Sequence, residues 1–132
     1  NSVVENVFAI HAKTGDKIII PPNYGHTTIN ASGQELKMAN WSERNFKSDY
    51  SIFQNNQGAC YYALCDSTEN NSLIWLKNNK YQFVPDLKIF EATDFLPLLA
   101  KFGLDSRQEM YRLIDNLEKL DFLKNPQKYN WI

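Results

Sequence analysis

The residues best suited to chemistry lie in one segment that runs from Gly15 to Asn30. Its sequence is Gly-Asp-Lys-Ile-Ile-Ile-Pro-Pro-Asn-Tyr-Gly-His-Thr-Thr-Ile-Asn. Gly15 permits a tight turn, the three isoleucines favour a strand, and Pro21-Pro22 end that strand rigidly. Gly25 lets the backbone reverse, so that His26 opens the next strand. An imidazole held in this way suits a metal ligand for iron, zinc, nickel or manganese, although a polar residue at a strand start is the simpler alternative.

The elements around this segment form a β-rich body followed by a helical tail. Periodicity indicates a hairpin over residues 72–84, with its turn at 77–80, and a long, potentially functional loop at 42–58. A short helix is expected from Thr93 or Asp94 to Phe102, where Gly103 stops it. A capping box at residues 106–109 then precedes an apolar stripe that indicates a docking face. The stripe comprises Met110, Leu113, Ile114, Leu117 and Leu120, and the further strands are expected at 3–12, 17–20, 26–31, 35–41 and 58–65.

The composition argues against a nucleic-acid-binding protein and against a membrane-spanning one. The 132 residues are 43% apolar and 22% charged, with a net charge of −1, so the chain lacks the positive charge of a typical nucleic-acid binder. No apolar run approaches the roughly 18 residues of a membrane span, and no signal peptide is visible. Cys60 and Cys65 are five apart and would point to opposite faces of a strand, so they are not expected to pair, which favours a reduced intracellular compartment, the cytoplasm.

The spacing of the motif resembles the second conserved motif of the cupin superfamily. Gly15, Pro21, His26 and Asn30 are in register, and Asn23 stands where that family usually has Gly. Within the superfamily, Pro21 to Asn30 is similar to the archaeal-type, metal-dependent glucose-6-phosphate isomerases. Lys47-Ser48-Asp49-Tyr50 occupies the place of that family's His-Asp-Tyr stretch, and the late hairpin followed by Pro85-Asp86 also corresponds. The resemblance spans about residues 10–88.

The resemblance implies a mainly β fold, in which residues 1–90 form part of a cupin-type β-barrel and residues 91–132 a helical tail that packs on the barrel or a partner. It also implies one divalent metal ion (Fe, Zn, Ni or Mn), with His26 as one ligand, and a sugar phosphate contacted by Tyr50. Ser48 replaces the family's usual histidine near that site. We expect the ring of His26 to point into the β body, close to Tyr50 or the 42–50 loop.

The family's first motif, a His-x-His pair with a glutamate, does not occur in this sequence. The other histidine, His11, precedes the motif and is interpreted as a strand residue. The family's base belongs to the missing motif, so the catalytic residue is unknown. Of the nearest acids, we expect Glu35 to be solvated, whereas Glu43 could approach the cavity. The chain, which begins with Asn, is therefore interpreted as the C-terminal part of an isomerase and is expected to be inactive alone.

The predicted function is the interconversion of glucose 6-phosphate and fructose 6-phosphate in glycolysis and gluconeogenesis. The expected partners are the sugar phosphate and either a second copy, forming a homodimer, or the N-terminal half of the protein, with no nucleic acid and no membrane. One alternative is another cupin enzyme that modifies sugars, such as an epimerase or oxygenase. The other is a non-catalytic cupin-like module whose helical tail binds a partner.

Overall fold

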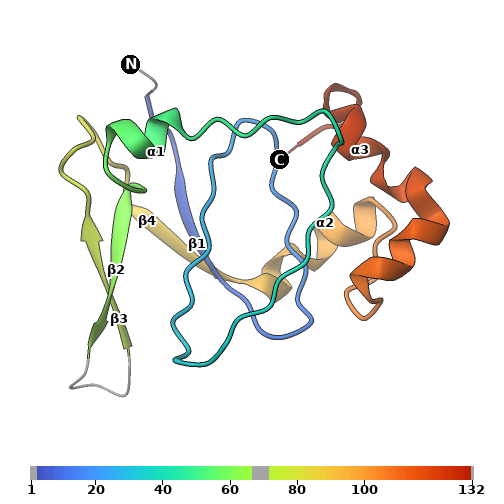
Figure 1. Ribbon diagram of the computed structural model, residues 1–132, viewed down its shortest axis with the longest axis horizontal. Helices are drawn as coiled ribbons and strands as arrows, with labels where there is room; N and C mark the ends of the chain where they lie inside the picture. The colour runs from blue at the N-terminus through green and yellow to red at the C-terminus, as the bar shows by residue number, and fades with distance from the viewer. Residues whose placement is uncertain (1–2, 67–71, 132) are drawn as a thin grey trace. The chain divides into compact units, whose positions relative to one another are not determined.

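The computed structural model describes residues 3–66 and 72–131, with the elements labelled in Figure 1. Contacts divide the chain into two compact units. Unit 1 comprises Asn1–Val7, Gly25–Met38 and Lys47–Lys88, and unit 2 comprises Phe8–Tyr24, Ala39–Phe46 and Ile89–Ile132. The elements are β1 (Val7–His11), α1 (Ser51–Asn55), β2 (Tyr61–Asp66), β3 (Ser72–Lys77), β4 (Leu87–Glu91), η1 (Ala92–Phe95), α2 (Leu96–Lys101), η2 (Met110–Leu120), α3 (Asp121–Lys124) and η3 (Pro126–Lys128), where η denotes a 3₁₀ helix.

The described strands form two separate two-stranded sheets. β1 pairs with β4, and β2 pairs with β3 in an antiparallel register that sets Ala63 opposite Trp75 and Leu64 opposite Ile74. Figure 1 shows β2 and β3 as a twisted ribbon in unit 1. Tyr62, Leu64, Ile74 and Leu76 lie on one face of this ribbon and are 37–55% exposed.

The expectation of a mainly β, cupin-type barrel is wrong for the described residues. They contain four short strands in two small sheets and no barrel, and about 27% of them are helical. A barrel requires each strand to pair with a neighbour on both sides until the sheet closes. The β-branched composition of the body favours extended backbone, but extended backbone becomes a sheet only where a second strand pairs with it.

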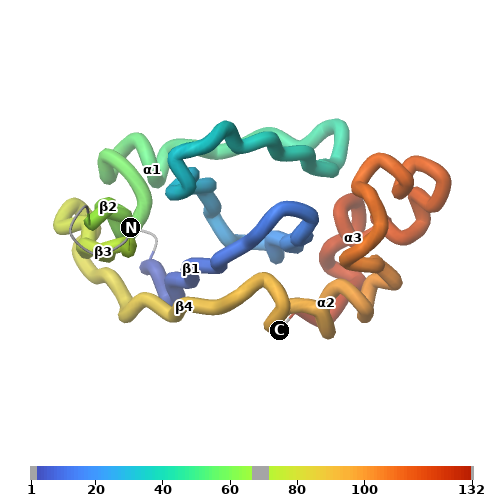
Figure 2. Tube along the Cα trace, turned by 90° about the horizontal axis from the view of Figure 1, so that it is seen from below, coloured from blue at the N-terminus to red at the C-terminus, as the bar shows by residue number. Residues whose placement is uncertain are grey.

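Three of the expected strands show this directly. Residues 12–50, all of which the structure describes, contain no helix or strand, so the strands expected at 17–20, 26–31 and 35–41 are absent. The Cα trace in Figure 2 follows this segment as an irregular path. The hairpin expected within 72–84 is also wrong, because β3 pairs with β2 and residues 81–84 form no strand. The strands expected at 3–12 and 58–65 are confirmed in shorter form as β1 and β2.

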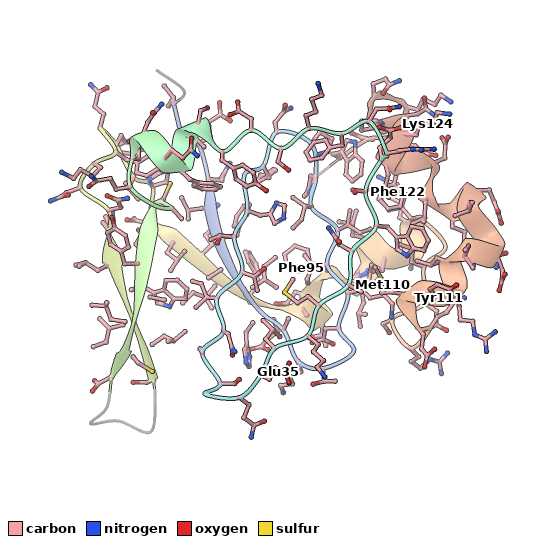
Figure 3. The ribbon with its side chains drawn as sticks, in the orientation of Figure 1. Glu35, Phe95, Met110, Tyr111, Phe122 and Lys124 are labelled. Atoms are coloured by element: carbon pink, nitrogen blue, oxygen red, sulfur yellow. The ribbon has the colours of Figure 1, made fainter. Side chains whose placement is uncertain are left out.

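The helical tail contains most of the buried apolar side chains. The helix expected up to Phe102 is confirmed as η1 and α2, and Gly103 follows it with φ +66°, the left-handed conformation that ends a helix. Phe102 packs on Phe122 with ring centroids 4.4 Å apart, and Trp131 lies 5.2 Å from the same ring. Figure 3 labels Phe122 within this aromatic cluster. The buried apolar residues of the tail are Ala92, Leu99, Phe102, Leu113 and Phe122.

The second half of the tail differs from its sequence pattern. The residues of the expected capping box precede a 3₁₀ helix, η2, whose N-cap is Glu109 with no side-chain cap bond. The expected apolar stripe is split, because Leu113 is buried while Ile114 and Leu117 are 47% and 55% exposed. Asn116 has a non-helical φ of −142° and ψ of 53°, so a kink separates Leu113 and Ile114 from Leu117 and interrupts the stripe. None of the helices in the described part of the chain has the length and apolar character needed to span a membrane.

Candidate functional site

The motif segment is held by turns rather than by a sheet. At its start, Asp16 N donates to Lys13 O at 3.0 Å and Lys13 N donates to Asp16 Oδ2 at 2.7 Å, while Gly15 takes φ +90°. After the prolines, Asn23 takes φ +67°. Asparagine tolerates the left-handed conformation, so Asn23 can take this backbone geometry without a glycine.

Asn30 closes the other end of the segment. Its side-chain Nδ2 donates to Gln34 O at 2.6 Å, and its Oδ1 accepts bonds from the Ser32 backbone at 3.1 Å and the Ser32 hydroxyl at 2.7 Å. The asparagine of the motif therefore holds the reversal around Gly33, in the manner of an Asx-turn. An asparagine two residues before Ser-Gly is a turn signal that could have been recognised in the sequence.

His26 is exposed and lies outside any helix or strand. The expectation that its ring is buried in a β body and opens a strand is therefore wrong. The described residues provide it with no hydrogen-bond or ion-pair partner, so no neighbouring group fixes the orientation of its ring. Its role as a metal ligand stays a prediction.

Gly25 is the point at which the His26 segment meets α1. A Cβ atom built on Gly25 would lie only 3.2 Å from Cζ of Phe53, so a larger residue would displace that ring. The observed reason for glycine is thus close contact, a signal that the sequence alone does not carry. Since Tyr50 immediately precedes α1, this contact places the segments that carry His26 and Tyr50 side by side within unit 1.

Tyr50 is 61% exposed at the N-terminus of α1. Next to it, Asp49 Oδ1 accepts a hydrogen bond from Ser51 N at 2.9 Å. Hydrogen bonds from the Ser51 hydroxyl and backbone lower the pKa of Asp49 below its usual value, so this carboxylate stays ionised beside Tyr50. The contact of Tyr50 with a sugar phosphate stays a prediction.

The two glutamates nearest to the motif, Glu35 and Glu43, contact neighbouring residues of the described chain and not the segment around His26. Glu35 is exposed as expected and lies 3.8 Å from Lys37 Nζ. Glu43 accepts hydrogen bonds from the backbone and side chain of Asn45, at 2.5 and 3.3 Å. His11 is confirmed as a strand residue in β1, and its Nδ1 lies 3.1 Å from Glu91 Oε2.

The cysteines are free thiols, in agreement with the expectation that they do not pair. Cys60 hydrogen-bonds to Tyr81, and partial burial raises the pKa of its thiol above the usual value. The same burial, followed by the nearby thiol, raises the pKa of Tyr81 to about 12. Both groups are protonated at neutral pH, which argues against Cys60 as a nucleophile.

A metal centre is not assembled by the residues that the structure describes. Among them, no group of three or more His, Cys, Asp and Glu side chains could hold a metal ion. Stable sites in proteins use three or four protein ligands, so His26 alone does not fit a complete centre. Two surface hollows are lined by residues of unit 2, and neither includes His26 or Tyr50.

The geometry around His26 and Tyr50 does not identify the class of protein, but comparison with known proteins does. A family model described as "Glucose-6-phosphate isomerase (GPI)" matches residues 1–83, well over half of the chain, and the chain belongs to that family. The match includes His26 and Tyr50 and ends before the helical tail. No curated protein and no solved structure matches the chain.

Proposed function

We propose that this chain serves the interconversion of glucose 6-phosphate and fructose 6-phosphate, in an isomerase of the metal-dependent, archaeal type. The family match over residues 1–83 carries the proposal, because it contains the whole segment from Gly15 to Asn30. In this proposal His26 supplies one metal ligand and Tyr50 contacts the sugar phosphate. The Gly25–Phe53 contact supports it by bringing those two segments together.

The reaction moves a hydrogen between C1 and C2 of the open-chain sugar. A base removes a proton from one carbon, an enediol forms, and the proton returns at the other carbon. Glu35 and Glu43 are not assigned as the base, since the first is exposed beside Lys37 and the second is bound to Asn45. We propose that the base and the remaining metal ligands lie outside the described residues, in the N-terminal half of the intact protein.

The test compares the two histidines in the intact protein. His26→Ala should remove most of the bound iron, zinc, nickel or manganese and most of the isomerase activity, because loss of a direct ligand exceeds the roughly 10–100-fold cost of losing a supporting residue. His11→Ala is the matched control and should retain both. Elemental analysis and a glucose 6-phosphate assay measure the two effects. Unchanged metal content in His26→Ala would contradict the proposed ligand role.

A second candidate, a non-catalytic sugar-phosphate binding module, is favoured by the absence of a three-ligand cluster among residues 3–66 and 72–131. Isothermal titration with glucose 6-phosphate, with and without EDTA, separates the two functions. Binding that EDTA leaves unchanged, without turnover, supports the module. Binding or turnover that EDTA abolishes supports the isomerase.

A further inference from the structure

A surface hollow of about 290 Å³ lies on the helical tail, within unit 2. Trp41 forms one side of it, and its indole Nε1 donates a hydrogen bond to Met110 O at 2.9 Å. That bond fixes the orientation of the indole, so the hollow has one rigid aromatic wall. The lining residues are Trp41, Ser42, Glu43, Leu117, Glu118, Leu120, Asp121, Leu123 and Lys124.

An exposed apolar row runs from this hollow along η2. Tyr111 and Ile114 lie one 3₁₀ turn apart on the same face of η2, and Leu117 follows a kink at Asn116, whose φ of −142° and ψ of 53° are non-helical. They are 73%, 47% and 55% exposed, whereas Leu113 on another face is only 3% exposed. Figure 3 labels Tyr111 and Lys124 toward opposite ends of the η2–α3 stretch. The row and the hollow together are called the tail groove below.

The charge around the hollow is negative. Glu43, Glu118 and Asp121 contribute three carboxylates to its lining against the amine of Lys124. Lys128 Nζ lies 3.9 Å from Asp121 Oδ2, so the carboxylates of Glu43 and Glu118 provide the excess of negative charge. Hydrogen bonds from Tyr129 and Asn125 lower the pKa of Asp121, so it is ionised at neutral pH. Glu118 makes no ion pair with any residue in the described part of the chain. A phosphate would be repelled here, which separates the tail groove from the sugar-phosphate chemistry proposed above.

We propose that the tail groove binds a short basic, amphipathic segment of a partner protein. A bulky apolar side chain of the segment fills the hollow between Trp41 and Leu117, and a neighbouring lysine or arginine faces Glu118 and Glu43. Exposed apolar surface gives the affinity, while the carboxylates select a cationic partner over an anionic one. An indole face beside carboxylates also favours a cation through its π electrons.

The test uses the intact chain and two fluorescent peptides of twelve residues. In one, leucines at helical spacing are interleaved with lysine and arginine, and in the other glutamate replaces every basic residue. The basic peptide should bind, and its affinity should fall as salt rises, because the screened carboxylates select it. Equal binding of the acidic peptide, or no binding of either, would overturn the proposal.

Two variants connect the binding to the groove. Glu118→Lys and Leu117→Asp should each weaken binding of the basic peptide at least tenfold, and both positions are exposed, so folding is retained. Glu109→Lys makes the same charge change at an exposed position outside the hollow and should bind normally. Circular dichroism verifies the fold of each variant. Unchanged binding in both groove variants, or a solution mass showing that a second copy already covers the groove, would contradict the proposal.

Discussion

The part of the chain that matches the isomerase family and the part that follows it are packed in opposite ways. The match ends at residue 83, and every buried apolar residue in the described structure comes after it, from Val84 to Phe122. Before residue 83, the single buried residue of the described chain is an asparagine, Asn78. The matched region therefore consists of turns, three short strands and one short helix, while the tail contains most of the buried apolar side chains.

The difference shows that the motif segment, residues 15–30, and the apolar core of the tail are stabilised by different interactions. Gly15, Asn23 and Asn30 set the course of the motif segment through local turns, which need no buried neighbours. The aromatic cluster around Phe102 and Phe122 requires side chains brought together from several helices. Apolar burial contributes most of the stability of a folded domain, so stability should respond far more to changes in the tail.

The strongest test of this contrast is Phe122→Ala. Phe122 is 4% exposed and its ring contacts Phe102, Tyr129 and Trp131, so truncation leaves a cavity and should lower the free energy of unfolding by about 3–5 kcal/mol. Phe46→Ala, in the matched region at 67% exposure, should change it by less than about 0.5 kcal/mol. Urea denaturation measures both values. Similar losses in the two variants would show that the contrast in packing has no energetic counterpart.

An intermediate effect is expected from Asn78→Ala in the matched region. Asn78 Nδ2 donates to Asn56 O and Ala59 O at 2.9 Å, and its Oδ1 accepts from Lys80 N at 3.0 Å. Removing the side chain leaves these part-buried backbone groups without their hydrogen-bond partner, which should cost about 1–3 kcal/mol. Asn79→Ala, at the exposed neighbouring position, serves as the control. Thermal unfolding compares the two, and an equal effect of both substitutions would exclude a special role for the buried amide.

The smallest effect concerns the pH dependence of the tail. Hydrogen bonds from Tyr129 and Asn125 lower the pKa of Asp121 in the folded state, so its stabilising contribution is present above the unfolded pKa of about 4. That contribution is lost as pH falls through the folded pKa. Asp121→Asn should lower the Tm at pH 6, and its difference from the wild type should shrink toward pH 2. Asp115→Asn, at an exposed position, is the control. A difference in Tm between Asp121→Asn and the wild type that stays constant from pH 6 to pH 2 would contradict the stabilising role of the ionised Asp121.

Local signals in the sequence predicted part of the fold. The helix that ends at Gly103, the strands β1 and β2 and the turn at Gly15 were recognisable because each depends on residues a few positions apart. The barrel was not correct, since strand pairing depends on distant partners that composition does not specify. The same limitation applies to β3. Residues 61–66 and 81–84 are both apolar segments that could pair with β3, and the structure shows that residues 61–66, which form β2, do so.

The motif spacing led to two predictions about the candidate site. The relation to glucose-6-phosphate isomerases is supported by the family match, whereas the roles of His26 and Tyr50 stay predictions. The exposure of His26 and the contact of Gly25 with Phe53 could not be read from the spacing, because the two segments are 28 positions apart. Asn30 was the exception, since its role in the turn is local and was available from its neighbours.

The discontinuity of unit 2 has a consequence for biosynthesis. Lys17 Nζ donates to Ser106 O at 2.7 Å, and Trp41 Nε1 donates to Met110 O, so contacts of this unit join positions 89 and 69 residues apart. On a ribosome, the segments around Lys17 and Trp41 emerge well before the helices that receive them. They must wait for the C-terminal third of the chain, and at about 5–20 residues per second that delay lasts several seconds. During this interval the segments around Lys17 and Trp41 lack the carbonyl groups of Ser106 and Met110 that accept their hydrogen bonds, and a truncation before Ser106 would leave them permanently without those partners.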